Sequence, residues 1–206
     1  SADAYKYLFY KASEILRAYG ITVLITVVGT SASLLITPLL AYPLSRKDFR
    51  ARNVFAFLVF FTMLFNGGIV PSYIMWTQIF HMKNTISALI LPGLLMNGFH
   101  VILMKNYFAQ NIPVELIEAA KMDGAGEFRI FYKMVLPLSL PIMATVGLFV
   151  GIGYWNDWTN GLYYITNPSL YSLQNLLNRI LQDVQFLSSS TLTQAAGTVN
   201  THKTPN

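Results

Sequence analysis

The residue types that carry enzymatic chemistry are scattered along this chain of 206 residues. Its histidines, His81, His100 and His202, are isolated from one another, so no metal site is expected. The run "GTSAS" at Gly29 lacks the last glycine of the G-x-S-x-G nucleophile elbow. The "GAG" at Gly124 has no Gly-Lys-Ser/Thr after it, which argues against phosphate binding. We therefore predict that the chain is not an enzyme and holds no metal or cofactor.

Another kind of chemistry is suggested by the charged segment "VELIEAAKMDGAGEFRIFYKMVLPLSLP", residues 114–141. Asn111 can cap its first helix, and Pro113 suits a first turn. Glu118 and Lys121 lie three residues apart on one side of this helix. The apolar positions recur on another side, at Ile112, Leu116, Ile117 and Ala120. The pattern predicts a short amphipathic helix with the small residues Ala119 and Ala120 in its middle.

The helix is expected to end at "DGAG", which begins at Asp123, because Gly124 can adopt the left-handed conformation. A second helix should follow, with apolar side chains recurring at Phe128, Phe131, Tyr132 and Val135. Pro137 and Pro141 are tolerated if they lie near the start of a membrane span. On physical grounds alone, this helix–turn–helix could equally be an ordinary interfacial hairpin between two spans.

The rest of the chain is apolar, with 54% hydrophobic and only 11% charged residues. Soluble domains carry about 25% charged residues, and a helix of roughly 20 apolar residues crosses a bilayer. Stretches without acidic or basic residues predict spans at 18–45, 53–66, 84–105 and 135–156. The expected fold is therefore an all-α, polytopic membrane helix bundle. The basic residues behind the net charge of +5 flank these spans, so no nucleic-acid partner is expected.

Basic residues crowd the loop between the first two predicted spans, at Arg46, Lys47, Arg50 and Arg52. The positive-inside rule places this loop in the cytoplasm. Alternation of the spans then places the amino terminus outside and residues 107–134 inside. Residues 157–206, which are aromatic, amphipathic and finally polar, are predicted to form an external segment.

Three polar or aromatic residues near glycines are candidates for a substrate pathway: Asn66, Asn97 and Tyr154. Asn66 belongs to "NGGIVP", which predicts an external turn before an interfacial helix, with a re-entrant segment as the alternative. Asn97 follows Pro92 and Gly93, which weaken the third span, either for a pathway or as a simple kink. Gly147 and Gly151 have the small-xxx-small spacing of close helix contacts.

The run "EAAKMDGAGEFRIFYKMVLP" resembles the EAA loop of the membrane subunits of ABC importers. The family pattern is matched at Glu118, Ala119, Ala120, Gly124, Leu136 and Pro137. Met134 stands where the pattern usually has isoleucine. The wider sequence, from about Tyr5 to Phe186, is similar to the carbohydrate-type, maltose-permease-like branch of this family.

This resemblance implies the permease fold of a bacterial ABC importer, in a multi-pass subunit of the cell (inner) membrane. Family members usually have six spans, so four would imply a truncated subunit. The expected partners are a second permease subunit, a cytoplasmic ATPase dimer that hydrolyses ATP, an extracellular solute-binding protein and membrane lipid. The EAA loop would be the coupling element, through Glu118, Ala119, Ala120, Asp123, Gly124, Leu136 and Pro137.

The expected function is import of sugars or oligosaccharides, driven by ATP and dependent on a binding protein. Two alternatives remain open at this point. The same machinery could carry a solute other than a sugar. The chain could also be a membrane scaffold or channel without a transport role.

Overall fold

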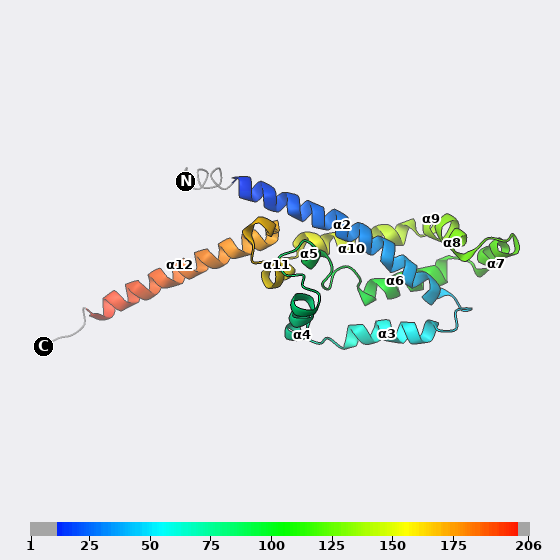
Figure 1. The fold of residues 1–206 in the computed structure, drawn as a ribbon, viewed down its shortest axis with the longest axis horizontal. Helices are drawn as coiled ribbons and strands as arrows, with labels where there is room; N and C mark the ends of the chain where they lie inside the picture. Colours follow the sequence, from blue (N-terminus) through cyan, green and yellow to red (C-terminus); the bar gives the residue numbers. More distant parts are fainter. Residues whose placement is uncertain (1–11, 202–206) are drawn as a thin grey trace.

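The computed structural model describes residues 12–201, and all regular structure in that range is helical (Figure 1). The predicted all-α fold is therefore confirmed. The elements, in chain order, are α2 (Ala12–Ser45), α3 (Arg52–Leu64), α4 (Ile69–Ile74), η1 (Met75–Ile79), α5 (Ser87–Ile90), α6 (Gly98–Asn111), α7 (Val114–Met122), α8 (Glu127–Ile130), η2 (Phe131–Val135), α9 (Leu136–Leu138), α10 (Leu140–Asn156), α11 (Thr159–Tyr164), η3 (Pro168–Leu170) and α12 (Leu173–Thr201).

Helix α2 is the longest helix of the bundle and packs along α10 and α6 (Figure 1). Small residues allow this close packing. A Cβ added at Gly147 would lie 3.1 Å from Leu34 Cδ1, and one added at Gly151 would lie 3.6 Å from Thr30 Oγ1. The small-xxx-small pair of α10 therefore faces α2, as its spacing suggested.

Within residues 12–201, α2 is the one unbroken helix that is long and apolar enough to cross a membrane. Two bent pairs also qualify when each is counted as one span. In the first, Arg52–Leu64 meets Ile69–Ile79 at 112°; in the second, Glu127–Leu138 meets Leu140–Asn156 at 78°. By these criteria the described residues hold up to three spans, where the sequence predicted four.

The stretch 84–105, predicted as one span, forms two helices instead. Helix α5 is a single turn, and α6 begins only at Gly98. Between them Pro92 has no N–H to donate, and Gly93 takes a left-handed φ of +74°, so the helix cannot continue. Asn97 then caps α6, since its Oδ1 accepts a hydrogen bond from the Phe99 N–H at 2.8 Å.

The bend before α10 is built around two prolines. The π-helical turn η2 precedes Pro137, and Pro141 lies in the first turn of α10. Neither proline has an N–H, which leaves backbone carbonyls one turn earlier without their helical donors. Ser139, which is fully buried at the bend, donates its hydroxyl to the Val135 carbonyl at 2.6 Å. The sequence therefore terminates one helix and starts another at a fixed angle.

At the other end of the molecule, the external segment predicted at 157–206 is held by Asn84. The Asn84 side chain accepts hydrogen bonds from the backbone N–H groups of Thr166 and Asn167, at 2.7 and 3.0 Å. Helix α12 then extends away from the bundle (Figure 1) and continues to Thr201. Residues 202–206, including His202, and the start of the predicted resemblance at Tyr5 lie outside the described residues.

Candidate functional site at helix α7

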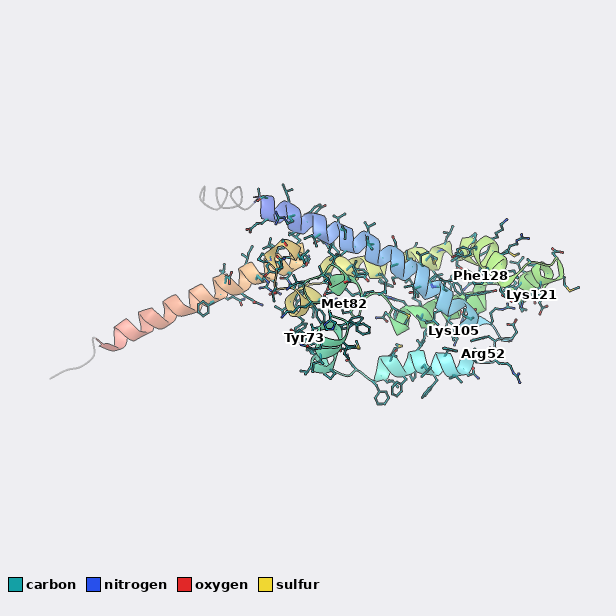
Figure 2. All side chains as sticks on the ribbon, in the orientation of Figure 1. Arg52, Tyr73, Met82, Lys105, Lys121 and Phe128 are labelled. Atoms are coloured by element: carbon teal, nitrogen blue, oxygen red, sulfur yellow. The ribbon has the colours of Figure 1, made fainter. Side chains whose placement is uncertain are left out.

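Helix α7 lies at one end of the molecule, which we call the α7 end. Lys121 and Phe128, on α7 and α8, lie at this end together with Arg52 and Lys105, whereas Tyr73 and Met82 lie far from them (Figure 2). The predicted helix 114–122 is present, but Asn111 does not cap it. Asn111 is still the last residue of α6, and its side-chain amide donates to the Tyr107 carbonyl at 3.1 Å. The cap prediction was wrong because Pro113, with extended backbone, occupies that position.

The end of α7 is a Schellman motif centred on Gly124. Gly124 has φ +77°, its N–H donates to the Lys121 carbonyl at 3.0 Å, and the Ala125 N–H donates to the Ala120 carbonyl at 2.9 Å. These are the two hydrogen bonds that define the motif. The predicted left-handed stop is thus present, and it directs the chain from α7 into α8.

Gly124→Ala is expected to destabilise the protein by about 1 kcal/mol, because an L-residue pays roughly this amount in the left-handed conformation. A Cβ at Gly124 would have no neighbour within 4 Å, so backbone strain is the whole effect. Thermal unfolding in detergent measures it. The matched control is Gly126→Ala, whose φ of −72° suits alanine and whose Cβ would also be in open space. Equal effects of the two substitutions would contradict this account of the turn.

The two faces of α7 have different surroundings. Ile117 and Ala120 are 4% and 8% exposed and belong to the main hydrophobic core, with Tyr42 of α2. Glu118 and Ala119 are exposed on the other face. The small side chain of Ala120 therefore lets α7 pack closely against the main core, whereas Glu118 and Ala119 are exposed and accessible to a partner.

A chain of polar contacts joins α7 to the end of α2. Lys121 Nζ lies 2.9 Å from Asp48 Oδ2, in the loop after α2, and 2.7 Å from Glu127 Oε1, on α8. The Tyr42 hydroxyl of α2 donates to Glu127 Oε2 at 2.9 Å. Arg46 completes the set, with its Nε 3.2 Å from Asp48 Oδ1. We call these five residues, Tyr42, Arg46, Asp48, Lys121 and Glu127, the charged link.

The charged link keeps its charges over a wide pH range. Hydrogen bonds from Lys121 and then Arg46 hold the pKa of Asp48 at about 2. Donation by Lys121 and by the Tyr42 hydroxyl holds the pKa of Glu127 below its usual value. A carboxylate with a lowered pKa contributes fully above its ordinary pKa of about 4 and loses its contribution as pH falls through the lowered value. Both carboxylates of the link are therefore ionised above about pH 5, and their hydrogen bonds raise the pKa of Lys121, so its cation persists at neutral and moderately alkaline pH.

Helix α7 is attached by the ion pairs of the charged link and by apolar burial, and these two contribute different free energies. The side chains of Lys121, Asp48 and Glu127 are 37%, 52% and 53% exposed, and exposed ion pairs contribute about 0–1 kcal/mol each. Burying one isoleucine such as Ile117 contributes roughly 1.5–3 kcal/mol. The apolar contact thus holds α7 in place, and the charged link fixes its orientation relative to α2.

Sequence spacing suggested that Lys121 would share a helix side with Glu118, but the structure pairs Lys121 with Asp48 and Glu127. The predicted site residues did not include Asp48, Glu127 or Tyr42. The available signal was a single aspartate within the basic loop "SRKDFRARN". Its partner, 73 residues away along the chain, could not be read from the sequence.

The other predicted coupling residues lie on either side of this region. Asp123 is exposed and forms the C-cap of α7. Leu136 and Pro137 form the start of α9, where Leu136 packs against the main core and Pro137 is exposed. The predicted coupling residues thus lie along the chain between the exposed face of α7 and the bend before α10.

The three candidate pathway residues are not brought together by any hydrogen bond within residues 12–201. Asn66 accepts a hydrogen bond from the Gly68 N–H at 2.9 Å, and Asn97 caps α6. Tyr154 is completely buried against Gly29, and its hydroxyl donates to the Ile90 carbonyl at 2.8 Å. Each therefore has a structural role in the chain, and Tyr154 is enclosed by it.

The chain is similar to known proteins over most of its length. The sequence model of one family, the "binding-protein-dependent transport system inner membrane component", matches residues 21–199. Protein LplC of Bacillus subtilis (strain 168) is 41% identical over 195 residues, which are 94% of this chain and 65% of the relative. The polygalacturonan/rhamnogalacturonan transport system permease protein YtcP, from the same organism, is 41% identical over 88% of this chain and 62% of its own.

A solved structure is also similar. It is the crystal structure of a bacterial ABC transporter involved in the import of the acidic polysaccharide alginate. One of its chains superimposes with a TM-score of 0.77 at 33% identity, over 87% of this chain and 64% of that one. The chain thus spans slightly less than two thirds of the length of each of these three proteins.

Proposed function

Since the chain belongs to the family of binding-protein-dependent transport system inner membrane components, we propose that it is the permease part of an ATP-driven importer of sugars or oligosaccharides. The sugar class is supported by the relative YtcP, named for polygalacturonan and rhamnogalacturonan transport, and by the alginate importer. The partners would be a second permease subunit and a cytoplasmic ATPase dimer. The bacterial inner membrane is the location that the family description supports.

The observation that carries this proposal is the two-faced attachment of α7. Its inner face is fixed to the core through Ile117 and Ala120, while Glu118 and Ala119 are exposed. A helix that is rigidly attached on one side and open on the other can receive a partner and transmit its movement. We assign the ATPase to the open face, which places the α7 end in the cytoplasm.

The charged link can transmit a movement of α7 to the end of α2. When the ATPase shifts α7, Lys121 carries Asp48 and Glu127 with it, and these carboxylates lead to Arg46 and Tyr42 at the end of α2. In parallel, Gly124 and α8 lead to the fixed bend at Ser139 before α10. Helices α2 and α10 pack on each other, so both routes end in the same helix pair. Closure at the ATPase would thereby reorient the spans that enclose the solute.

Glu118→Lys is expected to weaken association with the ATPase by at least about tenfold, because it reverses an exposed charge at the proposed docking face. Copurification of the ATPase from membranes, with titration in detergent, measures this. Asp183→Lys is the matched control for ATPase retention alone, since it makes the same reversal at an exposed position of α12, outside α7 but within the proposed contact of the binding protein. If Glu118→Lys retains the ATPase and normal solute-stimulated hydrolysis, the scaffold alternative is favoured and the coupling assignment fails.

A solute-binding protein is the third proposed partner, and the segment from Asn156 to Phe186 is its proposed contact. This segment presents exposed apolar side chains on α12, namely Leu177, Leu181 and Val184. Photocrosslinkers at Leu181 are expected to capture a binding protein of the same transporter. Crosslinks that reach only lipid would refute this contact without affecting the ATPase assignment.

A further inference from the structure

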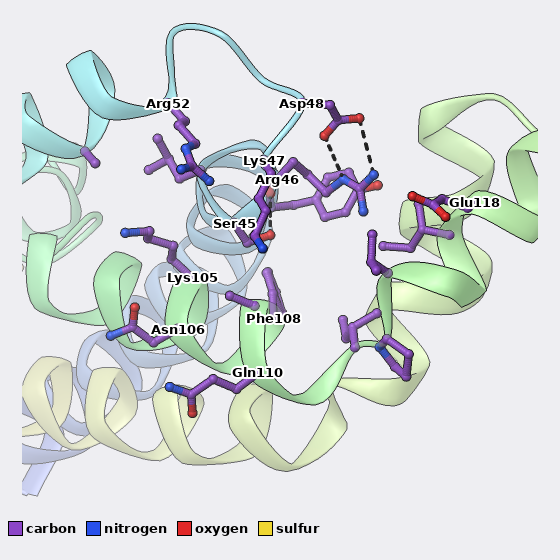
Figure 3. Close-up of a pocket in the computed structure, with 18 of the residues that line it drawn as sticks. Ser45, Arg46, Lys47, Asp48, Arg52, Lys105, Asn106, Phe108, Gln110 and Glu118 are labelled. Carbon is purple, nitrogen blue, oxygen red and sulfur yellow. Dashed lines mark hydrogen bonds and ion pairs between the residues drawn. The ribbon is translucent and has the colours of Figure 1, made fainter.

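A cavity of about 960 Å³ lies between the loop after α2, the start of α3, α6 and α7 (Figure 3). Its charged lining consists of Arg46, Lys47, Arg52, Lys105 and Lys121 with Asp48, Glu115 and Glu118. Arg46 and Lys121 are neutralised locally, because Asp48 pairs with both and Glu127 also pairs with Lys121. The remaining cations are Lys47, Arg52 and Lys105, which are not part of the charged link and have no role in the coupling route.

Arg52 and Lys105 are the unusual members of this lining. Both side chains are only partly exposed, yet neither forms an ion pair or a side-chain hydrogen bond with any residue in the range 12–201. Partial burial of a charge costs free energy unless an opposite charge compensates it. Figure 3 shows the two on one side of the cavity, from α3 and α6, with Asp48 and Glu118 on the other. The arrangement leaves a place for an anion between α3 and α6.

The start of α3 adds to this positive potential. Helix α3 has 13 residues, and its N-cap residue, Ala51, provides no side-chain hydrogen bond to the first turn. The Arg52 N–H donates to the Phe49 carbonyl at 3.2 Å, so the backbone N–H groups of Asn53 and Val54 are the ones that remain available, at the positive end of the helix dipole. The neutral side chains of Asn53, Asn106 and Gln110 also line the cavity and can donate further hydrogen bonds.

The surface that adjoins the cavity indicates what carries the anion. Directly after Arg52 and Asn53, α3 exposes Val54, Phe55 and Phe57, at 61%, 45% and 63%. A ligand held here has a charged group beside Arg52 and Lys105 and an apolar part along α3. We propose that this cavity is a specific site for the headgroup of an anionic phospholipid, with its acyl chains on α3.

The test is lipid binding to the permease in its assembled transporter, measured by native mass spectrometry. The probes are phosphatidylglycerol and, for comparison, the net-neutral phosphatidylcholine. The variant is Arg52→Gln with Lys105→Gln. Its control is Arg50→Gln with Arg129→Gln, which removes the same charge from two exposed positions outside the cavity lining. An unchanged thermal unfolding temperature verifies that each variant is folded.

The native protein is expected to prefer phosphatidylglycerol at least tenfold, and the Arg52/Lys105 variant to lose at least tenfold in affinity, since each such cation contributes to binding of anionic lipid. The Arg50/Arg129 control should stay within about twofold. Unchanged phosphatidylglycerol binding by the Arg52/Lys105 variant would overturn the proposal. Displacement of the lipid by inorganic phosphate would instead identify a soluble-anion site. Loss of the ATPase with unchanged lipid binding would identify a protein contact, and either result also overturns the proposal.

Discussion

Gly29→Ala is expected to lower the free energy of unfolding by about 2–3 kcal/mol, the upper range for overpacking a tight core. An added Cβ at Gly29 would overlap three carbons of the Tyr154 ring. The ring cannot move aside easily, because it is fully buried and its hydroxyl is bonded to the Ile90 carbonyl. The substitution therefore forces α2 and α10 apart at a tightly packed contact between them.

Equilibrium unfolding of the purified protein in detergent measures this effect, and α2 provides its own control. Gly20 is exposed on the same helix, and a Cβ there would have no neighbour within 4 Å. Gly20→Ala should consequently stabilise the protein by about 0.5–1 kcal/mol, through helix propensity alone. Combining Gly29→Ala with Tyr154→Ala should cost less than the sum of the single changes. Additive effects, or the same sign for Gly20 and Gly29, would refute the proposed packing.

Lys121→Met is expected to reduce solute transport about thirtyfold while the ATPase remains bound and active. The methionine keeps an unbranched side chain but removes both ion pairs, to Asp48 and to Glu127. Coupling between sites typically amounts to about 1–3 kcal/mol, and a loss in the middle of this range corresponds to roughly thirtyfold. The free energy of unfolding should fall by no more than about 2 kcal/mol, because the two lost ion pairs are exposed, at about 0–1 kcal/mol each, and Ile117 still holds α7.

Uptake and ATP hydrolysis measured on the same proteoliposomes separate coupling from folding. Lys133→Met is the control, since Lys133 is an exposed lysine of η2 outside the charged link. It should transport at the native rate. A proportional loss of uptake and hydrolysis in Lys121→Met would show that Lys121 supports assembly and not transmission.

Local chemistry made part of this site predictable. The helix over 114–122 and its stop at Gly124 follow from apolar periodicity and from the freedom of glycine, and both are present. The interruption around Pro92 and Gly93 was also visible, but its consequence was underestimated. These residues end a helix completely where the sequence suggested only a weakened span.

Long-range contacts set the limit of prediction. Asp48 and Lys121 are 73 residues apart in the chain, and only the packing of α7 under the end of α2 brings them together. Tyr154 is a predicted pathway residue because it is aromatic and lies close to glycines in the sequence. The glycine that matters is on another helix, and Gly29 gives the ring its buried position. Periodicity shows which face of a helix is apolar, but not which residue of another helix it meets.

The most direct test of the central claim, that α7 and the end of α2 move as one body, is a distance measurement. The chain has no cysteine, so spin labels can be placed uniquely at Met122 on α7, which is 89% exposed, and at Leu39 on α2, which is 43% exposed. Double electron–electron resonance spectroscopy then measures the distance between the two labels in the assembled transporter, with ATP bound and without nucleotide. We expect the same label distance in both states for the native protein and a shifted or broadened distance with ATP for Lys121→Met. A native distance that changes with ATP as much as that of the variant would contradict the claim.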